Sequence, residues 1–285
     1  MQYGMNLLLW TTRVEPEHLT LLRTLSNMGY DIVEIPIFDM DEIGRYETLG
    51  RHIRELGMQP LAVTALNADQ NICASDAGLR RQGEADLNRM VDCAAALQAP
   101  YLSGPLHSAL GVFTGQPPAS DELARSAEVL ARVAERGQGS GVRLGIEPLN
   151  RFECYLLNDT ASTASFVAAV GSGAGILYDT FHAHIEEKDA AAAIKLHHRD
   201  IALVHISEND RSTPGHGQVR WRETFAALKE VGYSGPLVVE AFGLALPELS
   251  AATRIWRRMF DDELTLAQQA LDFMRSAWEG EITDG

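Results

Sequence analysis

Cysteine is scarce in this sequence, with Cys73, Cys93 and Cys154 as its three representatives among 285 residues. Their number is odd, no two of them form a CxxC pair, and none of their spacings marks a zinc site. The sequence therefore argues against a disulfide scaffold and against a cysteine zinc centre. We predict reduced thiols in a cytoplasmic protein.

Long apolar segments and linker-like segments are missing too. No run of about 18 apolar residues occurs, so we predict no membrane-spanning helix. The first five residues lack the basic region, the apolar run and the cleavage site of a signal peptide. Because no Pro-rich, Ser-rich or low-complexity block divides the chain, we expect residues 1–285 to form one domain.

Basic residues are outnumbered by acidic ones, 24 Lys and Arg against 39 Asp and Glu, which gives a formal net charge of -15. A charge of this sign repels polyanions, so it argues against nucleic acid or an anionic membrane as the main partner. It leaves room for a local basic pocket. With 46% hydrophobic and 22% charged residues, the composition has ample material for a core.

What the sequence does contain is a regular alternation of short β-branched runs and longer amphipathic stretches. The short runs predict eight strands, at residues 5–10, 32–37, 60–66, 101–106, 142–148, 175–180, 202–207 and 237–241. The longer stretches predict eight helices, at residues 16–28, 40–56, 77–97, 121–136, 160–170, 187–198, 221–231 and 251–278. Eight strand–helix units in succession are typical of an α/β protein with a (β/α)8 TIM barrel as a single domain.

An open, doubly wound sheet is the alternative fold. It normally uses fewer strands and often has a glycine-rich nucleotide-binding turn after the first. Here the first predicted strand leads into the run WTTR at residues 10–13, which contains no glycine. We therefore favour the closed barrel. Its longest irregular segments follow strands, which places them at the C-terminal face where barrel active sites are built: residues 67–75, 108–120 and 209–220.

The last four predicted strands each end in a polar residue: Glu147, Asp179, His205 and Glu240. Because alternate residues of a strand face opposite sides, the flanking apolar residues face the helices and the four polar residues face the barrel interior. Three carboxylates at one point repel one another unless a cation lies between them. A carboxylate-rich set with one imidazole suits Mn²⁺, Mg²⁺ or Co²⁺ better than structural zinc. Each residue alone has a bland interpretation as a solvated strand end, but four at matching positions predict a metal site.

Glu153, His182 and Arg211 follow three of these residues by six, three and six positions. Each is within reach of a metal-bound molecule from its loop. Spacing alone equally allows a turn-capping histidine or a surface ion pair, so the roles of these three residues stay open at this point.

The segments around these residues are IEPLNRFE at 146–153, DTFH at 179–182, VHISENDR at 204–211 and VE at 239–240. They resemble the sugar isomerase/epimerase barrel family, and within it most closely the ketose 3-epimerases of the D-tagatose and D-allulose (psicose) group. The resemblance spans most of the chain, from residue 4 to residue 242, and it is most specific over strands five to eight.

The resemblance implies an isomerase that binds one divalent ion, Mn²⁺ first and Mg²⁺ or Co²⁺ as alternatives, through Glu147, Asp179, His205 and Glu240. Glu147 and Glu240 would double as two acid/base groups. The implied reaction is epimerisation at C3 of a free ketose, of the D-tagatose, D-fructose/D-allulose or L-ribulose type, through an enediolate. The family tends to form dimers or tetramers, so we expect a homodimer or homotetramer.

The resemblance also implies that Glu153, His182 and Arg211 hold the sugar around its first carbons. The run GHGQVRW at 215–221 matches a family loop that we interpret as structural. The family often carries an aromatic residue where this chain has Asn6, at a position expected to face the pocket. That departure leaves the substrate preference open.

Other functions share such a scaffold. An aldose–ketose isomerase or a polyol dehydratase would use the same metal and enediolate, and the sequence does not exclude either. A metal-dependent DNA-repair endonuclease, with His107 and His182 as extra ligands of a second ion, would need a basic rim that the net charge of -15 argues against. A barrel that binds sugar without catalysis would usually have lost a ligand or a base. No phosphate cradle is evident, which favours unphosphorylated sugars.

Overall fold

The computed structural model describes residues 1–280, and the last five residues of the predicted domain lie outside that range. Eight parallel strands close into a barrel in the order of the sequence, so the predicted (β/α)8 TIM barrel is confirmed. The strands are β1 (Tyr3–Asn6), β2 (Ile32–Pro36), β3 (Gln59–Val63), β4 (Tyr101–Gly104), β5 (Arg143–Ile146), β6 (Ala174–Asp179), β7 (Ile201–Ile206) and β8 (Leu237–Val239).

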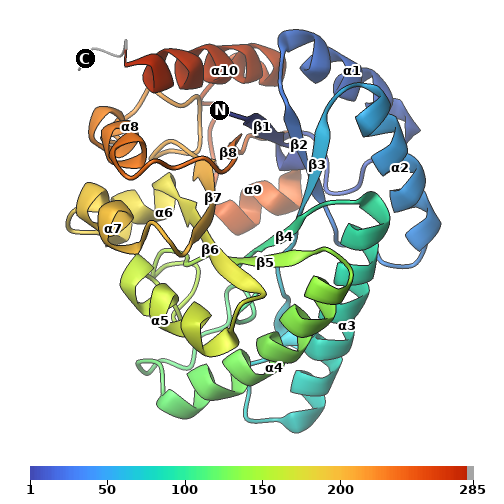
Figure 1. Cartoon of the computed structure of the whole chain (residues 1–285), viewed down its shortest axis with the longest axis vertical. Coiled ribbons are helices and arrows are strands. Elements are labelled where there is room, and N and C mark those ends of the chain that lie inside the picture. Colours follow the sequence, from blue (N-terminus) through green and yellow to red (C-terminus); the bar gives the residue numbers. More distant parts are fainter. Residues whose placement is uncertain (281–285) are drawn as a thin grey trace.

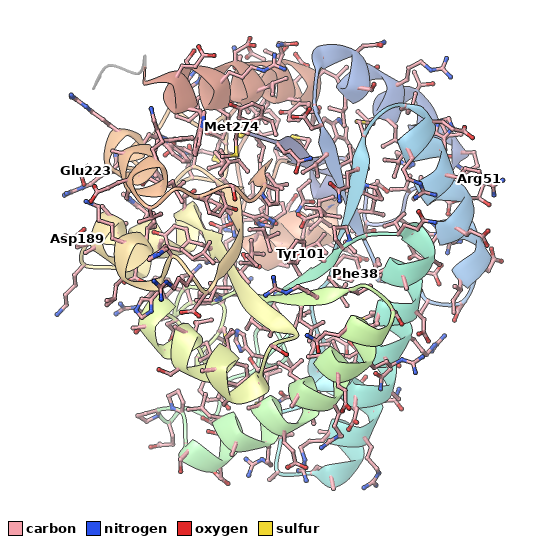
Figure 2. The ribbon with its side chains drawn as sticks, in the orientation of Figure 1. Phe38, Arg51, Tyr101, Asp189, Glu223 and Met274 are labelled. Atoms are coloured by element: carbon pink, nitrogen blue, oxygen red, sulfur yellow. The ribbon has the colours of Figure 1, made fainter. Side chains whose placement is uncertain are left out.

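Helices surround the strands as an outer ring (Figure 1). The helices are α1 (Leu19–Met28), α2 (Ile43–Glu55), α3 (Ala77–Leu97), α4 (Ser120–Gly139), α5 (Thr160–Val170), α6 (Thr180–Glu186), α7 (Ala190–His197), α8 (Trp221–Glu230), α9 (Pro247–Thr253) and α10 (Glu263–Glu279), of which α9 lies over the end of the barrel and not in the ring. Figure 2 shows Arg51 and Glu223 on the outer sides of α2 and α8, whereas Met274 of α10 points to the barrel, where it is fully buried. This is the amphipathic arrangement that the sequence pattern predicts.

The predicted boundary of the first strand, residues 5–10, is wrong at its C-terminal end. Strand β1 stops at Asn6, and Leu7–Leu9 forms a short 3-10 helix. The Asn6 side chain causes the change, because its Oδ1 accepts a hydrogen bond from the Leu8 backbone N–H at 2.8 Å and so caps the new turn.

The sequence predicts one helix over residues 251–278, but the structure has two helices in this region, α9 and α10. Helix α9 ends at Arg254, which adopts a left-handed conformation with φ of 61°, and α10 begins after Asp262, whose side chain accepts from the Thr265 N–H at 2.8 Å. Helix α6 was also missed. It starts directly after β6, where the Asp179 carboxylate accepts from the first N–H groups of the helix.

The barrel interior is filled in two layers of opposite chemistry. The lower layer is an apolar plug made of Ile32, Leu61, Leu177, Leu203 and Val238, each fully buried or nearly so. Two residues further along the chain, four of these five positions are followed by polar side chains, namely Glu34, Asp179, His205 and Glu240, whereas Leu61 is followed by the apolar Val63. The alternation therefore places the polar layer on top of the plug, at the C-terminal end of the barrel.

The three cysteines are buried and unpaired, as predicted. Within residues 1–280, no helix combines the length and the hydropathy needed to cross a bilayer.

Gly104 is the last residue of β4, at the C-terminal end of the barrel. Its replacement tests this part of the fold. It has φ of +127°, and a Cβ there would lie 2.0 Å from the Thr64 carbonyl oxygen. Its own carbonyl accepts the Glu147 N–H at 3.0 Å. We expect G104A to lower the free energy of unfolding by about 3 kcal/mol, because neither backbone can move freely.

The matched control for this variant is G44A. A Cβ on Gly44 in α2 meets nothing within 4 Å, so this change should raise the free energy of unfolding by about 0.5 kcal/mol through helix propensity. Denaturant unfolding of both variants checks the pair. Equal stability of G104A and the parent would contradict the backbone contact with Thr64.

Candidate metal centre and active site

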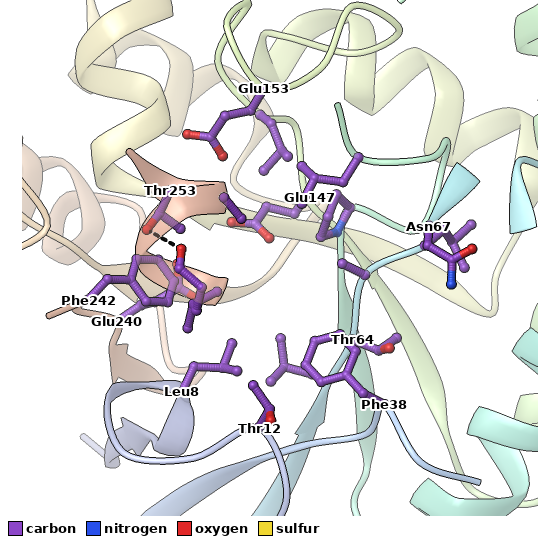
Figure 3. Close-up of a pocket in the computed structure, with 18 of the residues that line it drawn as sticks. Leu8, Thr12, Phe38, Thr64, Asn67, Glu147, Glu153, Glu240, Phe242 and Thr253 are labelled. Carbon is purple, nitrogen blue, oxygen red and sulfur yellow. Dashed lines mark hydrogen bonds between the residues drawn. The ribbon is translucent and has the colours of Figure 1, made fainter. Parts of the chain in front are cut away.

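Four side chains meet at the C-terminal end of the barrel, as the sequence predicts. One possible ligand atom from each of Glu147, Asp179, His205 and Glu240 lies within 4.8 Å of the others, and all four residues are buried. Glu147 and Glu240 directly follow β5 and β8, whereas Asp179 and His205 lie on β6 and β7. A cavity of about 570 Å³ opens above them, and Figure 3 shows Glu147, Glu153 and Glu240 on its wall.

The donor atoms of this cluster fit a cation. His205 Nε2 lies 2.8 Å from the Glu34 carboxylate and donates to it, so Nδ1 is the ring nitrogen that faces the cluster. Nδ1 lies 3.4 Å from Glu240 and 3.7 Å from Asp179, and it has no hydrogen-bond partner. Glu147 Oε1 is also buried without a partner. Two unpartnered acceptors among three carboxylates are what a divalent ion would satisfy.

The charges of the cluster point the same way. Burial and the nearby Glu240 carboxylate raise the pKa of Glu147 well above its usual range. Burial lowers the pKa of His205, but the carboxylates of Glu34 and Glu240 outweigh it and raise the value well above normal. A divalent cation would supply the missing positive charge and remove this repulsion between the carboxylates.

Arg211 is the cation that the chain itself contributes. Its Nη1 lies 3.0 Å from Asp179 and 2.9 Å from Glu240, and its guanidinium stacks 3.9 Å from the Phe181 ring centre. Although burial opposes ionisation of Asp179, the Arg211 charge holds the pKa of that carboxyl well below its usual range. Arg211 has a left-handed backbone with φ of 64°, and its side chain reaches Asp179 and Glu240 of the cluster.

His182 and Glu153 also reach the cavity. The Asn150 backbone N–H donates to His182 Nδ1 at 2.9 Å, and His182 Nε2 lies 3.6 Å from Glu147 and 2.8 Å from an Arg211 nitrogen. Burial and the Arg211 charge lower the pKa of His182 to about 3, so the ring is neutral. Burial raises the pKa of Glu153, and the Asn150 amide donates to its carboxylate at 2.8 Å. These positions fit contacts to a small polar ligand.

His107 lies elsewhere than a second-ion site would require. Its Nε2 is 3.1 Å from the Glu147 carbonyl oxygen and its Nδ1 is 3.1 Å from Ser108 Oγ, so both ring nitrogens have protein partners.

The loop of residues 215–221 is held by Glu208, which accepts from Gly215 N and from the Trp221 indole, both at 2.8 Å. This agrees with a structural role for that loop.

One residue of the site, Glu34, escaped the sequence analysis, and a second, Asn6, was noted there only for its departure from the family pattern. Glu34 is fully buried on β2 and contacts His205, and Asn6 contacts both Glu34 and Glu240. Asn6 was expected to face the pocket, but its amide is fully engaged by these partners and by Leu8. The available signal was a carboxylate in the middle of the apolar strand IVEIP, which needs buried partners of its own.

Comparison with known proteins now adds to this geometry. Residues 22–277 match the model of the family described as xylose isomerase-like TIM barrel. The chain is 32% identical to L-ribulose 3-epimerase of Mesorhizobium japonicum, over 95% of this chain and 92% of that protein. It is 30% identical to a ketose 3-epimerase of Arthrobacter globiformis, over 96% of each.

Solved structures agree. The crystal structure of D-psicose 3-epimerase with D-tagatose, from Clostridium cellulolyticum H10, superposes with a TM-score of 0.88. Its sequence identity to this chain is 27%, with 98% of this chain and 99% of that chain covered. The chain therefore belongs to the xylose isomerase-like TIM barrel family, among relatives that are isomerases named as ketose 3-epimerases.

Proposed function

We propose that this protein epimerises free ketoses at C3 with the help of one divalent cation, Mn²⁺ being preferred and Mg²⁺ or Co²⁺ being alternatives. Glu147, Asp179, His205 and Glu240 hold the ion. The observation that carries the proposal is the convergence of these four side chains, two of them with unpartnered buried acceptors, beneath a cavity of about 570 Å³. The names of the relatives support C3 of a ketose as the reacting centre.

The cavity wall supports an unphosphorylated sugar. Among the described residues that line it, Arg211 is the single arginine and no lysine is present, and the Arg211 guanidinium is already paired with Asp179 and Glu240. A phosphate dianion would need free cations or helix N-terminal N–H groups. The opposite wall is largely apolar and includes Leu8, Phe38 and other carbon side chains (Figure 3).

Two carboxylates carry out the proton transfers. A divalent cation held by the four-residue cluster would polarise the ketose carbonyl and make the neighbouring C–H acidic. Glu147 and Glu240 both line the cavity, from β5 and β8. One takes the C3 proton, which leaves an enediolate, and the other returns a proton to the opposite face of C3. His182 and Arg211 contact the substrate oxygens, and Glu153 accepts from a hydroxyl.

Incubation of the Mn²⁺-loaded protein with D-tagatose, D-fructose, D-allulose and L-ribulose in deuterated water tests the proposal. We expect C3 epimers with deuterium at C3, because an accessible carboxylate exchanges its proton with solvent. An aldose–ketose isomerase would form an aldose and label C1 or C2, or transfer hydrogen without label. Aldose products, or loss of water from a cyclic polyol, would replace the proposal by one of its rivals.

Arg211 and His182 separate substrate contacts from cation contacts. We expect R211A and H182A to bind Mn²⁺ at least as well as the parent, since each removes a donor and no ligand. Turnover of a ketose should fall and its KM should rise. Metal-free R211A should also lose about 3–5 kcal/mol of stability, because Asp179 and Glu240 lose their buried partner.

Manganese titration and thermal melts with and without Mn²⁺ measure these effects. Saturating Mn²⁺ should restore most of the stability that R211A loses, because the ion replaces the missing charge. A variant that cannot be loaded with Mn²⁺ would show that the residue belongs to the cation site instead.

A further inference from the structure

A buried hydrogen-bond network joins the far side of the barrel to the cluster. Glu34 on β2 accepts from the Asn6 amide at 2.9 Å and from Ser103 Oγ at 2.9 Å, and it contacts His205 Nε2 at 2.8 Å. The exposed fractions of Asn6, Glu34, Ser103 and His205 are 1% or less. A carboxylate without solvent therefore receives three protein donors from strands β1, β4 and β7.

Asn6 extends this network to a second cluster residue. Its Nδ2 carries two hydrogens, and the atom lies 2.9 Å from Glu34 Oε2 and 3.0 Å from Glu240 Oε1. Its Oδ1 accepts from the Leu8 N–H at 2.8 Å, which fixes the amide orientation. Every hydrogen-bonding group of the Asn6 side chain is thus used, and the side chain cannot rotate without losing three contacts.

We propose that Glu34 and Asn6 are positioning residues that set the geometry and donor strength of His205 and Glu240 toward the cation. Glu34 keeps the proton of His205 on Nε2, so that Nδ1 presents its lone pair to the cluster, and its charge makes the imidazole a stronger donor. Asn6 holds Glu240 Oε1 in place while Arg211 holds Oε2 at 2.9 Å. The inference rests on the proposed cation site, and it assigns Asn6, where the related family often has an aromatic residue, a role in this chain.

E34Q is the first variant to make. The amide has the shape of the carboxylate and can still accept from His205, so the change removes mainly the charge. We expect the Mn²⁺ dissociation constant of E34Q to rise by about 10- to 100-fold. The visible absorption of the Co²⁺-loaded protein should also change, since the imidazole donor is altered. Titration of chelator-treated protein with Mn²⁺ alone, and Co²⁺ spectra of the folded protein, provide readouts independent of turnover.

D86N is the matched control. Asp86 is another buried carboxylate with two amide donors, Gln70 at 2.9 Å and Gln82 at 3.0 Å, but it lies on α3 outside the cluster. The D86N variant should lower thermal stability without changing Mn²⁺ affinity or the Co²⁺ spectrum.

N6A is the second variant, in case E34Q does not fold. It should weaken Mn²⁺ binding and alter the Co²⁺ spectrum, because Glu240 Oε1 loses its donor.

The measurements on E34Q, N6A and D86N distinguish a positioning role from a purely structural one. Weaker Mn²⁺ binding and a changed spectrum in E34Q or N6A, but not in D86N, support the positioning role. Affinities within twofold of the parent in every variant that folds overturn it, even if stability falls. A parent protein that binds no divalent ion refutes the proposed cation site itself, and the positioning role with it.

Discussion

E147Q and E240Q should each lower the turnover of a C3 epimerisation by about 10³-fold or more, in both directions of the reaction. Inversion at C3 requires one group to remove a proton and another to return one from the opposite face, so losing either stops the cycle. Glutamine keeps an oxygen atom at the same place. Part of the cation affinity should therefore survive, and the loss of chemistry can be measured on loaded protein.

E147Q and E240Q should differ in which C3 epimer of the ketose exchanges its C3 hydrogen with solvent deuterium. With one carboxylate intact, a variant can still remove and return the C3 proton on one face of the sugar. We expect slow deuterium incorporation into one C3 epimer without net inversion, and the labelled epimer should differ between E147Q and E240Q. Nuclear magnetic resonance of the recovered ketose measures this. A loaded variant with near-parental epimerase activity would contradict the two-carboxylate mechanism and require a single base or a water-assisted route.

Removal of divalent ions should abolish activity altogether. Without a cation, burial and the nearby Glu240 carboxylate keep the pKa of Glu147 well above its usual range, so ionisation of this group is disfavoured. The ketose carbonyl then also lacks the cation that would polarise it. We expect prolonged dialysis against a chelator to give an inactive protein, and Mn²⁺ or Co²⁺ to restore activity better than Ca²⁺, which prefers more oxygen ligands.

Metal removal should also lower thermal stability. A ligand at about 100 times its dissociation constant stabilises the folded state by about 2.7 kcal/mol, so the melting temperature should rise with added Mn²⁺. Dialysis against the same buffer without chelator is the control. Full activity in protein shown by elemental analysis to contain no metal would refute the proposed mechanism.

The sequence predicted the barrel and the four cluster residues for related reasons. In β7, the apolar residues before His205 alternate between the plug and the helices, so the side on which His205 lies follows from the period of two. Closure of eight strands then brings strand ends together regardless of loop details. Glu147, Asp179 and Glu240 were placed by the same argument.

Features that depend on contacts between distant residues could not be predicted in this way. Glu34 and His205 are 171 positions apart, and no periodicity reveals which buried donor a carboxylate meets. Asn6 lies in an apolar run, where strand propensity hides the capping contact to Leu8 that ends β1. Helix α9 was merged with α10, because the left-handed Arg254 between them has no glycine signal.

The apolar plug has a kinetic consequence. Because Leu177, Leu203 and their neighbours fill the barrel below the cluster, a cation, a sugar and exchanging protons would all share the entrance at the C-terminal end. Four residues of α9 line that entrance, and Figure 1 shows the helix in the centre of the ring. An ion held by the four-residue cluster would lie below a sugar bound in the cavity. Binding at the proposed site would therefore be ordered, with the ion first in and last out, and a resident sugar would block ion exchange.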